Sequence, residues 1–521
     1  MKFKKSQFPS TIKTYFFKVA TCIFFGITAG INVSLSSSSA VTIFSLAILF
    51  LFIKNCNKIF AQSFLVLCWT VGFVTASCYW IIIAIYDPIL TPVSTACLVA
   101  SSLFIAHALI YASSYYLINI LIYTIYPNTC KNSNILVAIM SFSISFGIAE
   151  IVRSLGFWAM PWGMIGYTQT TNSLFSGVYP IAGSYVVTII TVLFSAILVL
   201  VFESISNQLS KNSTSGFLIY LINNSIHIVI AMTIVVILFL TKYIEWTREE
   251  NNERLRARVV HTHIPNIQKY DVKVQQYSLQ KIIDLSSLND VDLTIYPELY
   301  LVKPAYGIEK QSRKQIVKAV IASKNSQLFG VPDNEVATSG TILGSLNVML
   351  QIDEYGNTKR YAKEILLPFS EYMPTHPLLV WAMPYIFKFP LANFNSGELS
   401  NAIPLQIKNV KLAISICNEI AYPNNIHKHA ANSQVLINSA SDSWIPNQMY
   451  ALHSWQISKV RAMEAQKPML RSNNTGYSGY IDAWGKENAM EYEAEAIQKY
   501  EVTPRIGNTP YTNLVSFFNQ I

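Results

Sequence analysis

The sequence has few of the residues that build disulfide frameworks or metal sites. It contains 7 cysteines among 521 residues, and six of them fall in or beside apolar segments, where they do not form a disulfide framework. Its 8 histidines include no HExxH pair, and no spacing of cysteine and histidine resembles a zinc site. We therefore expect neither structural disulfides nor a bound metal.

Charged side chains are also scarce, at 13% of the residues, although the net charge is +9. The lysines and arginines lie mainly at the N-terminus, in short loops and on ordinary helices. The sequence has no dense basic stretch like those of nucleic-acid-binding proteins. We therefore expect no nucleic-acid partner, and a membrane protein accounts for the charge pattern.

What the sequence does have is long apolar segments, which make up most of its first half. Hydrophobic residues are 52% of the total, and the second half has an ordinary mixed composition. Seven segments approach the roughly 20 residues that cross the core of a bilayer. They cover residues 19–35, 36–53, 61–86, 94–126, 135–151, 178–202 and 217–240. Because six segments follow the first, we interpret the first as a retained helix rather than a cleavable signal peptide.

The charges in the loops predict how these segments are oriented. The N-terminal lysines share one side of the membrane with Lys54, Lys58, Lys131 and Lys211. The positive-inside rule therefore predicts that the N-terminus is cytoplasmic. Seven crossings then place the residues after Tyr243 outside. In a bacterium with two membranes, this means an inner-membrane protein whose second half lies in the periplasm.

The change in composition predicts three parts. Residues 1–245 form an α-helical multi-pass membrane domain, residues 246–508 a second domain, to which the motifs described below assign catalysis, and residues 509–521 a short tail. From residue 256 onward, strands alternate with amphipathic helices, which is typical of a layered α/β domain.

One buried strand of the second half ends on a cysteine. Residues 412–416 are mostly apolar and include two β-branched isoleucines, which predicts a buried strand, and Cys417 follows it directly. Cys417 is the only cysteine after Cys130, so it has no partner in its own half of the chain. A free cysteine is often a small buried hydrophobe. A catalytic thiol is the alternative that the other polar residues favour.

Glu298 and Lys363 also fall in predicted strands or just beyond their ends. Each is compatible with a solvated surface residue, but their chemistry fits that of Cys417. A carboxylate can take the proton of a thiol, and the thiolate is the nucleophile. An ammonium can stabilise the thiolate and then the oxyanion of a tetrahedral intermediate. A second acid, Glu371, follows Lys363 and can position it.

These motifs resemble those of a known superfamily. Residues 296–298 (Tyr-Pro-Glu), 363–371 and 416–419 are similar to the Glu-Lys-Cys motifs of the nitrilase, or carbon–nitrogen hydrolase, superfamily. With a membrane half before them, their order and spacing resemble the apolipoprotein N-acyltransferase family. Residues 150–167 and 461–476 are similar to two further stretches of that family. The resemblance covers nearly the whole chain, and it implies an αββα sandwich for the second half.

The sequence departs from the family pattern at several positions. Family members usually have Trp before Pro297, Gly at the position of Ser370 and an aromatic residue at that of Asn418. They have an Asn-Asp-x-Trp-Phe-Gly run where this chain has residues 441–446, Ser-Asp-Ser-Trp-Ile-Pro. They also tend to end on an eighth membrane helix, and residues 509–521 are what a truncated last helix would leave. These differences bear on substrate preference and turnover more than on reaction type.

The resemblance implies a mechanism for these residues. Cys417 would attack a phospholipid ester, typically of phosphatidylethanolamine, and form a thioester. The N-terminal amine of a diacylglyceryl-cysteine in an apolipoprotein would then take the acyl chain. Glu298 would be the general base and Lys363 the oxyanion stabiliser, Glu371 would position Lys363, and Glu419 would help to order the site. No metal or organic cofactor is needed.

Four aromatic residues are candidates for contacting the lipid. Trp381 and Phe387 lie in residues 372–394, an apolar stretch whose prolines prevent a membrane-spanning helix. This stretch is either a core segment of the α/β domain or an arm that dips into the headgroup region. Trp444 and Trp162 complete the set, although tryptophans near a membrane edge often form only an interfacial belt.

Two other functions compete with this interpretation. One is a membrane-tethered nitrilase-type amidase that hydrolyses a small C–N substrate, for which seven spans are more than a tether requires. The other is a transporter or lipid-binding scaffold with a degenerate enzyme domain. It would place ionisable residues along a pathway at mid-bilayer depth. The sequence offers mainly Glu150 with Arg153, which can pair one helical turn apart, and the lone His107 and His227.

Overall fold

The computed structural model divides the chain into two compact units. It describes residues 10–35, 38–86, 91–125, 135–156, 158–171, 174–209, 236–250, 253–304, 307–336, 341–368, 370–372, 393–397 and 404–519. The first unit comprises Met1–Ile82, Ala96–Val178 and Gly183–Tyr243, and the second comprises Ile83–Thr95, Tyr179–Ala182 and Ile244–Ile521.

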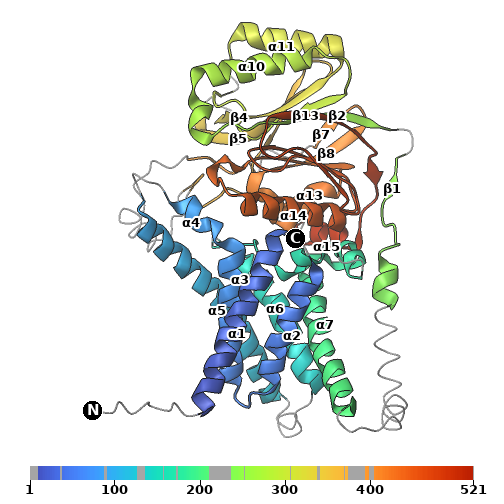
Figure 1. Cartoon of the computed structure of the whole chain (residues 1–521). Helices are drawn as coiled ribbons and strands as arrows, with labels where there is room; N and C mark the ends of the chain where they lie inside the picture. Colours follow the sequence, from blue (N-terminus) through green and yellow to red (C-terminus); the bar gives the residue numbers. More distant parts are fainter. Residues whose placement is uncertain are drawn as a thin grey trace. The chain divides into compact units, whose positions relative to one another are not determined.

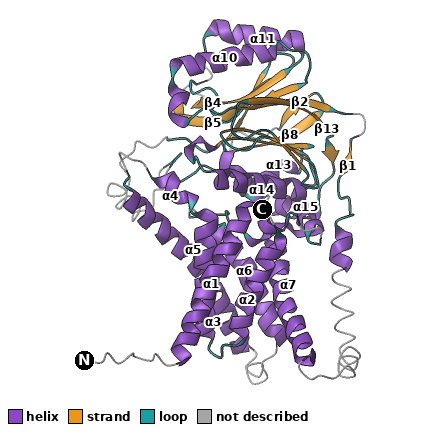
Figure 2. Cartoon of the chain, viewed as in Figure 1, coloured by secondary structure: helices purple, strands orange, loops and turns teal. Residues whose placement is uncertain are grey.

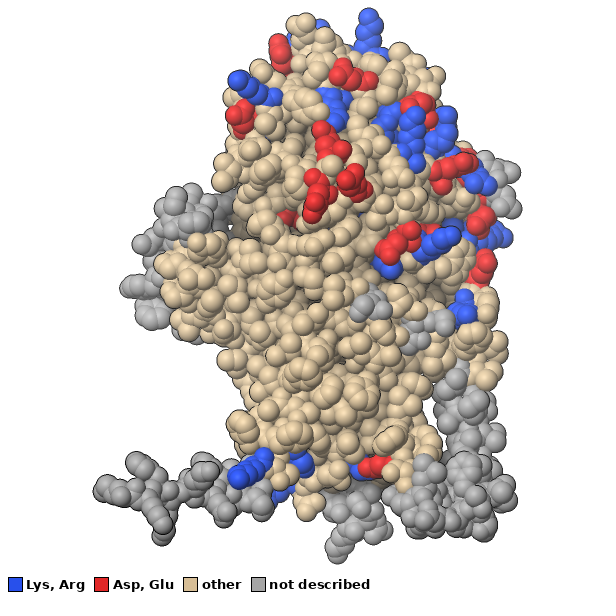
Figure 3. Space-filling model, in the orientation of Figure 1, with Lys and Arg blue, Asp and Glu red and all other residues tan. Residues whose placement is uncertain are grey.

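The first unit is built of apolar helices (Figure 1). They are α1 (Ser10–Leu35), α2 (Ser39–Lys54), α3 (Ile59–Cys78), α4 (Trp80–Ile85), α5 (Val93–Ile125), α6 (Ile135–Arg153) and α7 (Tyr179–Leu209), of which α4, α5 and α7 also extend into the second unit. Among the described residues, five helices are long and apolar enough to cross a membrane, and α2 is a shorter apolar helix. The face of this unit that Figure 3 shows carries almost no charged side chains between its ends. The predicted apolar helical half is thus confirmed, while most of the seventh predicted span, residues 217–240, lies outside the described residues.

The prediction of a single helix over residues 61–86 is wrong. Helix α3 ends at Cys78, and the short helix α4 begins at Trp80. The Trp80 indole donates a hydrogen bond of 3.2 Å to the carbonyl of Ser77. The last carbonyls of a helix have no partner within the helix, so this bond satisfies one of them where the chain turns.

Glu150 and Arg153 do not pair directly, contrary to the prediction. The hydroxyl of Tyr111 lies between them: it donates to Glu150 Oε1 at 3.2 Å and accepts from Arg153 Nη1 at 2.8 Å. Glu150 also accepts from the amide of Ile165 at 2.7 Å, and Arg153 Nη2 donates to the carbonyl of Trp162 at 3.0 Å. The two charges therefore fix the chain that follows α6, as buried polar groups must find partners.

The second unit contains two six-stranded sheets. The first has the order β13-β2-β3-β4-β5-β6 and the second β12-β11-β10-β9-β8-β7. The strands of the first sheet are β2 (Leu255–His261), β3 (Leu293–Ile295), β4 (Ser326–Val336), β5 (Ile342–Ile352), β6 (Thr358–Ala362) and β13 (Ala496–Val502). Those of the second are β7 (Leu405–Ile407), β8 (Val410–Ile416), β9 (Val435–Ser441), β10 (Met469–Asn474), β11 (Gly479–Ile481) and β12 (Glu487–Ala489).

Helices cover the outer faces of both sheets (Figure 2). Helices α10 (Val272–Ser286) and α11 (Lys310–Ser323) lie over the first sheet, and α13 (Pro423–Ala430), α14 (Gln448–Ala465) and α15 (Pro510–Phe518) over the second. Buried side chains of both sheets, including Ile295 and Ile414, form one core between them. The predicted αββα sandwich is thus confirmed. It satisfies the need of each sheet for apolar cover on both faces.

The strands β2, β3 and β4 run parallel, as do β8, β9 and β10. Strands β4 to β6 are antiparallel neighbours, so β6 points the same way as β4. The carboxyl ends of β2, β3, β4 and β6 therefore meet at one edge of the first sheet. Glu298 and Lys363, described next, lie in chain segments that leave this edge.

Helix α15 lies in the second unit rather than apart from it. Its Thr512 hydroxyl lies 2.9 Å from His427 Nδ1, and the Thr509 hydroxyl donates to the carbonyl of Glu464 at 2.7 Å. Tyr511 packs edge-on against the His427 ring, with centroids 4.8 Å apart. Residues 510–518, which we predicted as part of a separate tail, thus contact α13 and α14.

Candidate active site

The predicted catalytic residues follow the ends of three strands. Glu298 lies just after β3, Lys363 directly after β6, and Cys417 directly after β8. All three strands are apolar and buried at these ends, so their backbones hold the following residues in place. The sheet topology thus gathers three reactive groups from distant parts of the sequence.

Lys363 lies between two carboxylates. Its ammonium is 2.8 Å from Glu371 Oε1 and 3.3 Å from Glu298 Oε1. Its side chain is only 2% exposed, and a buried charge is tolerated only where it is paired. Burial alone would lower the pKa of Lys363, but Glu298 and Glu371 hold it well above its usual value. The lysine is therefore a permanent cation of the site.

Asn347 joins the same group and was not found from the sequence. Its Nδ2 donates to Glu298 Oε1 at 2.7 Å and to Glu371 Oε1 at 3.1 Å. The backbone amide of Leu367 donates to the other oxygen of Glu371 at 2.8 Å. These bonds fix both carboxylates relative to Lys363. The only signal in the sequence was an amide residue in the mainly apolar strand β5, which also contains Ser345 and Gln351.

Cys417 occupies a strained backbone position. Its φ is +51°, a left-handed conformation that costs energy for a residue with a side chain. This turn directs the chain away from β8 into a 3-10 turn, Cys417–Ala421. Burial raises the pKa of the Cys417 thiol well above its usual value; the negative charge of Glu298 raises it further, while Lys363 lowers it. These surroundings therefore favour the neutral thiol of Cys417 over the thiolate.

Glu419 ties the chain before Cys417 to the chain after Lys363. Its Oε2 accepts from the amide of Ile416 at 2.6 Å, and its Oε1 accepts from the amides of Glu364 and Ile365 at 2.6 and 3.1 Å. The hydroxyl of Tyr361 donates to Oε2 at 3.1 Å. Despite these donors, burial raises the pKa of Glu419 to about 7. One carboxylate thus sets the position of the nucleophile relative to the lysine.

Helix α14 supports the turn that carries Cys417. Arg461 Nε donates to the carbonyl of Ile420 at 3.0 Å, and Arg461 Nη1 pairs with Glu464. Glu464 in turn lies 3.1 Å from His427 Nε2 on α13. All three side chains are buried, so this hydrogen-bonded network connects α13 and α14 to the turn that carries Cys417.

The aromatic residues predicted to contact lipid have different surroundings. Trp444, in the turn Asp442–Trp444, is 53% exposed and presents its ring to solvent. Trp162 is buried in the first unit, where its ring packs edge-on against Trp80 with centroids 5.4 Å apart. Trp381 and Phe387 lie outside the described residues. A role for these four in substrate binding stays a prediction.

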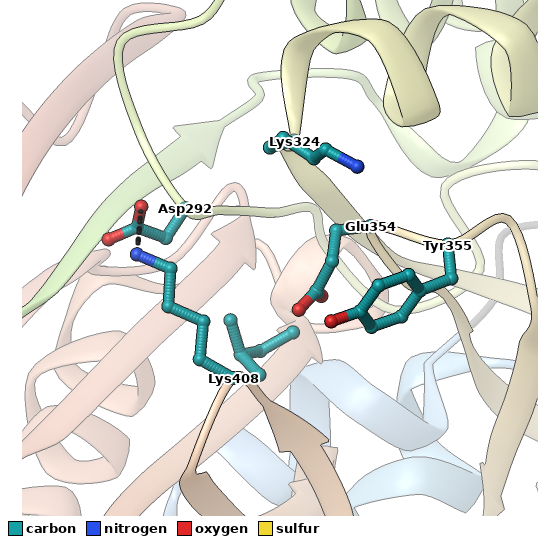
Figure 4. A pocket seen from close by; sticks show the side chains of 6 residues that line it. Asp292, Lys324, Glu354, Tyr355 and Lys408 are labelled. Carbon is teal, nitrogen blue, oxygen red and sulfur yellow. Dashed lines mark hydrogen bonds and ion pairs between the residues drawn. The ribbon is translucent and has the colours of Figure 1, made fainter.

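Figure 4 shows a pocket in the second unit that is lined by other residues. Its volume is about 230 Å³, and its lining includes Asp292, Lys324, Tyr355 and Lys408. Lys408 donates to Asp292 at 2.9 Å. Asp292 and Lys408 precede β3 and β8, so they lie at the amino ends of strands whose carboxyl ends carry Glu298 and Cys417. The pocket is therefore not part of the site.

Comparison with known proteins agrees with this geometry. Residues 26–197 match the family model of the apolipoprotein N-acyltransferase N-terminal domain, and residues 265–502 match that of the carbon-nitrogen hydrolases. The apolipoprotein N-acyltransferase of Photobacterium profundum is 25% identical over 71% of this chain and 68% of its own. That of Pseudomonas aeruginosa is 28% identical over 71% and 69%, and that of Haemophilus influenzae 27% over 72% and 70%. The matches extend over both units.

Proposed function

Because the chain belongs to the apolipoprotein N-acyltransferase family, we propose that it transfers an acyl chain from a phospholipid to the N-terminal amine of a lipoprotein precursor. The observation that carries the proposal is the position of Lys363 between Glu298 and Glu371, with electrostatic coupling to Cys417. This arrangement provides a nucleophile, a base and a fixed cation, which acyl transfer through a thioester requires.

In the first half-reaction, Glu298 takes the thiol proton while the Cys417 sulfur attacks the ester carbonyl. The ammonium of Lys363 stabilises the oxyanion that forms. When the intermediate collapses, the C–O bond to the glycerol breaks, and Glu298 returns the proton to the departing lysophospholipid. Cys417 is left as an acyl thioester. Glu371 and Asn347 keep Lys363 and Glu298 in place throughout.

In the second half-reaction, the amine of the diacylglyceryl-cysteine attacks the thioester. Glu298 takes a proton from the nitrogen, and Lys363 again stabilises the oxyanion. The C–S bond breaks, an amide forms, and Glu298 reprotonates the thiolate of Cys417. A thioester suits this exchange because it is more reactive toward an amine than the ester from which it came.

We further propose phosphatidylethanolamine as the donor, an inner-membrane location and a periplasmic catalytic domain. The positive-inside pattern of the loops supports this orientation. The five long apolar helices among the described residues are more than the tether of a soluble-type amidase needs. An arm over residues 372–394 that lifts the lipid from the bilayer, with Trp381 and Phe387, stays part of the proposal, as does a contact of Trp444 or Trp162 with the lipid.

The test is mass spectrometry of the purified full chain mixed with phosphatidylethanolamine and a diacylglyceryl-cysteine peptide. We expect an acyl adduct on Cys417 before the peptide is added, and an N-acylated peptide afterwards. Cys417→Ser should give neither product. If the wild type forms no adduct, or forms one that only water removes, the transferase proposal is wrong and a hydrolase is favoured.

A further inference from the structure

A second buried lysine lies at the edge where the catalytic residues gather. Lys269 belongs to the 3-10 turn Asn266–Tyr270, in the segment that follows β2. Its side chain is only 6% exposed. Nothing in the acyl-transfer mechanism above uses it, although a lysine is among the most costly side chains to bury.

The tip of Lys269 lies beside the strand next to the nucleophile. Its Nζ donates to the hydroxyl of Ser441 at 2.6 Å. Ser441 ends β9, and β9 runs parallel to β8 with Ile416 opposite Ser439. With strands about 4.8 Å apart and about 3.3 Å per residue, Ser441 and Cys417 lie about 6 Å apart at Cα. The ammonium therefore reaches the strand next to β8, and it is coupled electrostatically to Glu298 and Cys417.

Lys269 retains hydrogen-bonding capacity in the structure. An ammonium has three N–H donors, and one of them is occupied by Ser441. No carboxylate in the described part of the chain forms an ion pair with Lys269, whereas Lys363 has two. Burial lowers the pKa of Lys269 to about 8, although Glu298, Cys417 and Asp442 raise it. A buried cation of this kind gains most from an anionic ligand.

We propose that Lys269 receives the phosphodiester of the phospholipid acyl donor. This proposal rests on the phospholipid-dependent transfer proposed above. In a glycerophospholipid, the phosphate is joined to the reacting ester by the short glycerol backbone, so an ester at Cys417 brings the phosphate to the neighbouring strand. Lysine is a common ligand of phosphate oxygens, which it binds by charge-assisted hydrogen bonds. Lys363 serves the acyl oxygen, and Lys269 serves the phosphate.

The test compares two acyl donors in the Lys269→Met variant of the full chain. One donor is phosphatidylethanolamine in detergent micelles, and the other is p-nitrophenyl octanoate, which has no phosphate. The readout is the initial rate of acylation at Cys417 as a function of donor concentration, measured by intact-protein mass spectrometry. We expect the half-saturating concentration of phosphatidylethanolamine to rise by about tenfold or more, which is the value of one charge-assisted hydrogen bond. The rate with the octanoate ester should fall far less.

Three further variants make the result decisive. Lys269→Arg keeps the charge, so its half-saturating concentration of phosphatidylethanolamine should be close to that of the wild type. Ser441→Ala should raise this concentration less than Lys269→Met does, again with little effect on the octanoate ester. Lys273→Met removes one exposed positive charge four positions away and should match the wild type. Equal losses with both donors would make Lys269 an oxyanion donor or a structural cation, and no loss with either would make it a distant counterion; both outcomes overturn the proposal. Acylation of the wild type by phosphatidylethanolamine tests the proposed function separately.

Discussion

The carboxylate of Glu371 lies 2.8 Å from the ammonium of Lys363, closer than the 3.3 Å that separates Lys363 from Glu298. The shorter contact is thus to the residue that takes no part in the proton transfers proposed above. In that mechanism, Glu371 would keep the lysine from closing fully on Glu298, which would leave oxygen lone pairs of Glu298 for the thiol proton.

Glu371→Gln should therefore lower the rate of acylation without removing any reacting group. Lys363 would then pair with Glu298 alone and draw it away from the thiol. We expect the rate of thioester formation to fall by about 10²-fold, as for loss of general-base catalysis. The measurement is single-turnover acylation of Cys417, with the exposed Glu309→Gln as matched control. A rate within a few-fold of the wild type would show that Glu371 does not position the lysine.

The titration of Cys417 should respond to Glu298. Burial raises the pKa of the thiol first, and the negative charge of Glu298 raises it further. Glu298→Gln removes that charge, so the pH midpoint of Cys417 alkylation by iodoacetamide should move down. Peptide mass spectrometry separates Cys417 from the cysteines of the first unit. Glu354→Gln, at the other end of the strands, should leave the midpoint in place, and an upward shift in Glu298→Gln would contradict the electrostatic argument.

Glu419 should make the stability of the second unit depend on pH. Its folded-state pKa of about 7 exceeds the ordinary value of 4.5, so the folded protein holds this proton more tightly than the unfolded one. The contribution to stability is therefore full below pH 4.5 and is lost as the pH rises toward 7. The Tm of Glu419→Gln should lack this pH-dependent component, so it should fall less than the Tm of the wild type over the same pH interval. Parallel curves for the two proteins would refute the assignment.

Glu419→Gln should also slow acylation with any donor. The carboxylate accepts hydrogen bonds from backbone N–H groups on both of its oxygens, and the amide nitrogen of Gln would face one set of these donors without being able to accept from them. We expect a fall of about tenfold or more, together with a lower Tm, as for a broken buried hydrogen-bond network. A loss confined to phospholipid donors would point instead to a role in substrate binding.

Helix α15 should stabilise the fold of the second unit. Tyr511 packs on His427, and His427 contacts Glu464, which pairs with Arg461. Tyr511→Ala should therefore cost about 3 kcal/mol of unfolding free energy, typical of a buried aromatic residue. Phe518→Ala is the control, because Phe518 is 66% exposed. If both variants melt alike, α15 is not an integral part of this unit.

The sequence was sufficient to predict the features that depend on local apolar patterns. Residues 412–416 predict β8 because they are a short apolar run, and the strand in the structure extends from Val410 to Ile416. Strand β13 was missed because only Tyr500 and Val502, near its end, are buried, while its other positions include charged residues and an exposed isoleucine. Glu298, Lys363 and Glu371 could be grouped with Cys417 by their chemistry and by a resemblance to a family, but not by any local pattern that gives their distances. Their distances depend on contacts between residues far apart in the chain, which local patterns do not contain.

Two features of the site had almost no signal. Asn347 is one of several polar residues in the mainly apolar strand β5, and only the fold places it between two carboxylates. Lys269 reads as one lysine in a polar loop, because nothing local indicates that its side chain is buried. The bond from Tyr111 that separates Glu150 from Arg153 was missed for the same reason: Tyr111 lies on another helix.

The pairing of β2 with β13 affects the order in which the second unit can fold during synthesis. Leu255 lies opposite Val502, so β2, which is synthesised early in the unit, can pair on this side only after β13 has been synthesised. Until then β2 exposes unpaired backbone groups at a sheet edge, which invites pairing with other chains. The thiol of Cys417 is synthesised before this edge is covered. The nascent unit therefore has an interval in which the edge of β2 must be kept from pairing with other chains.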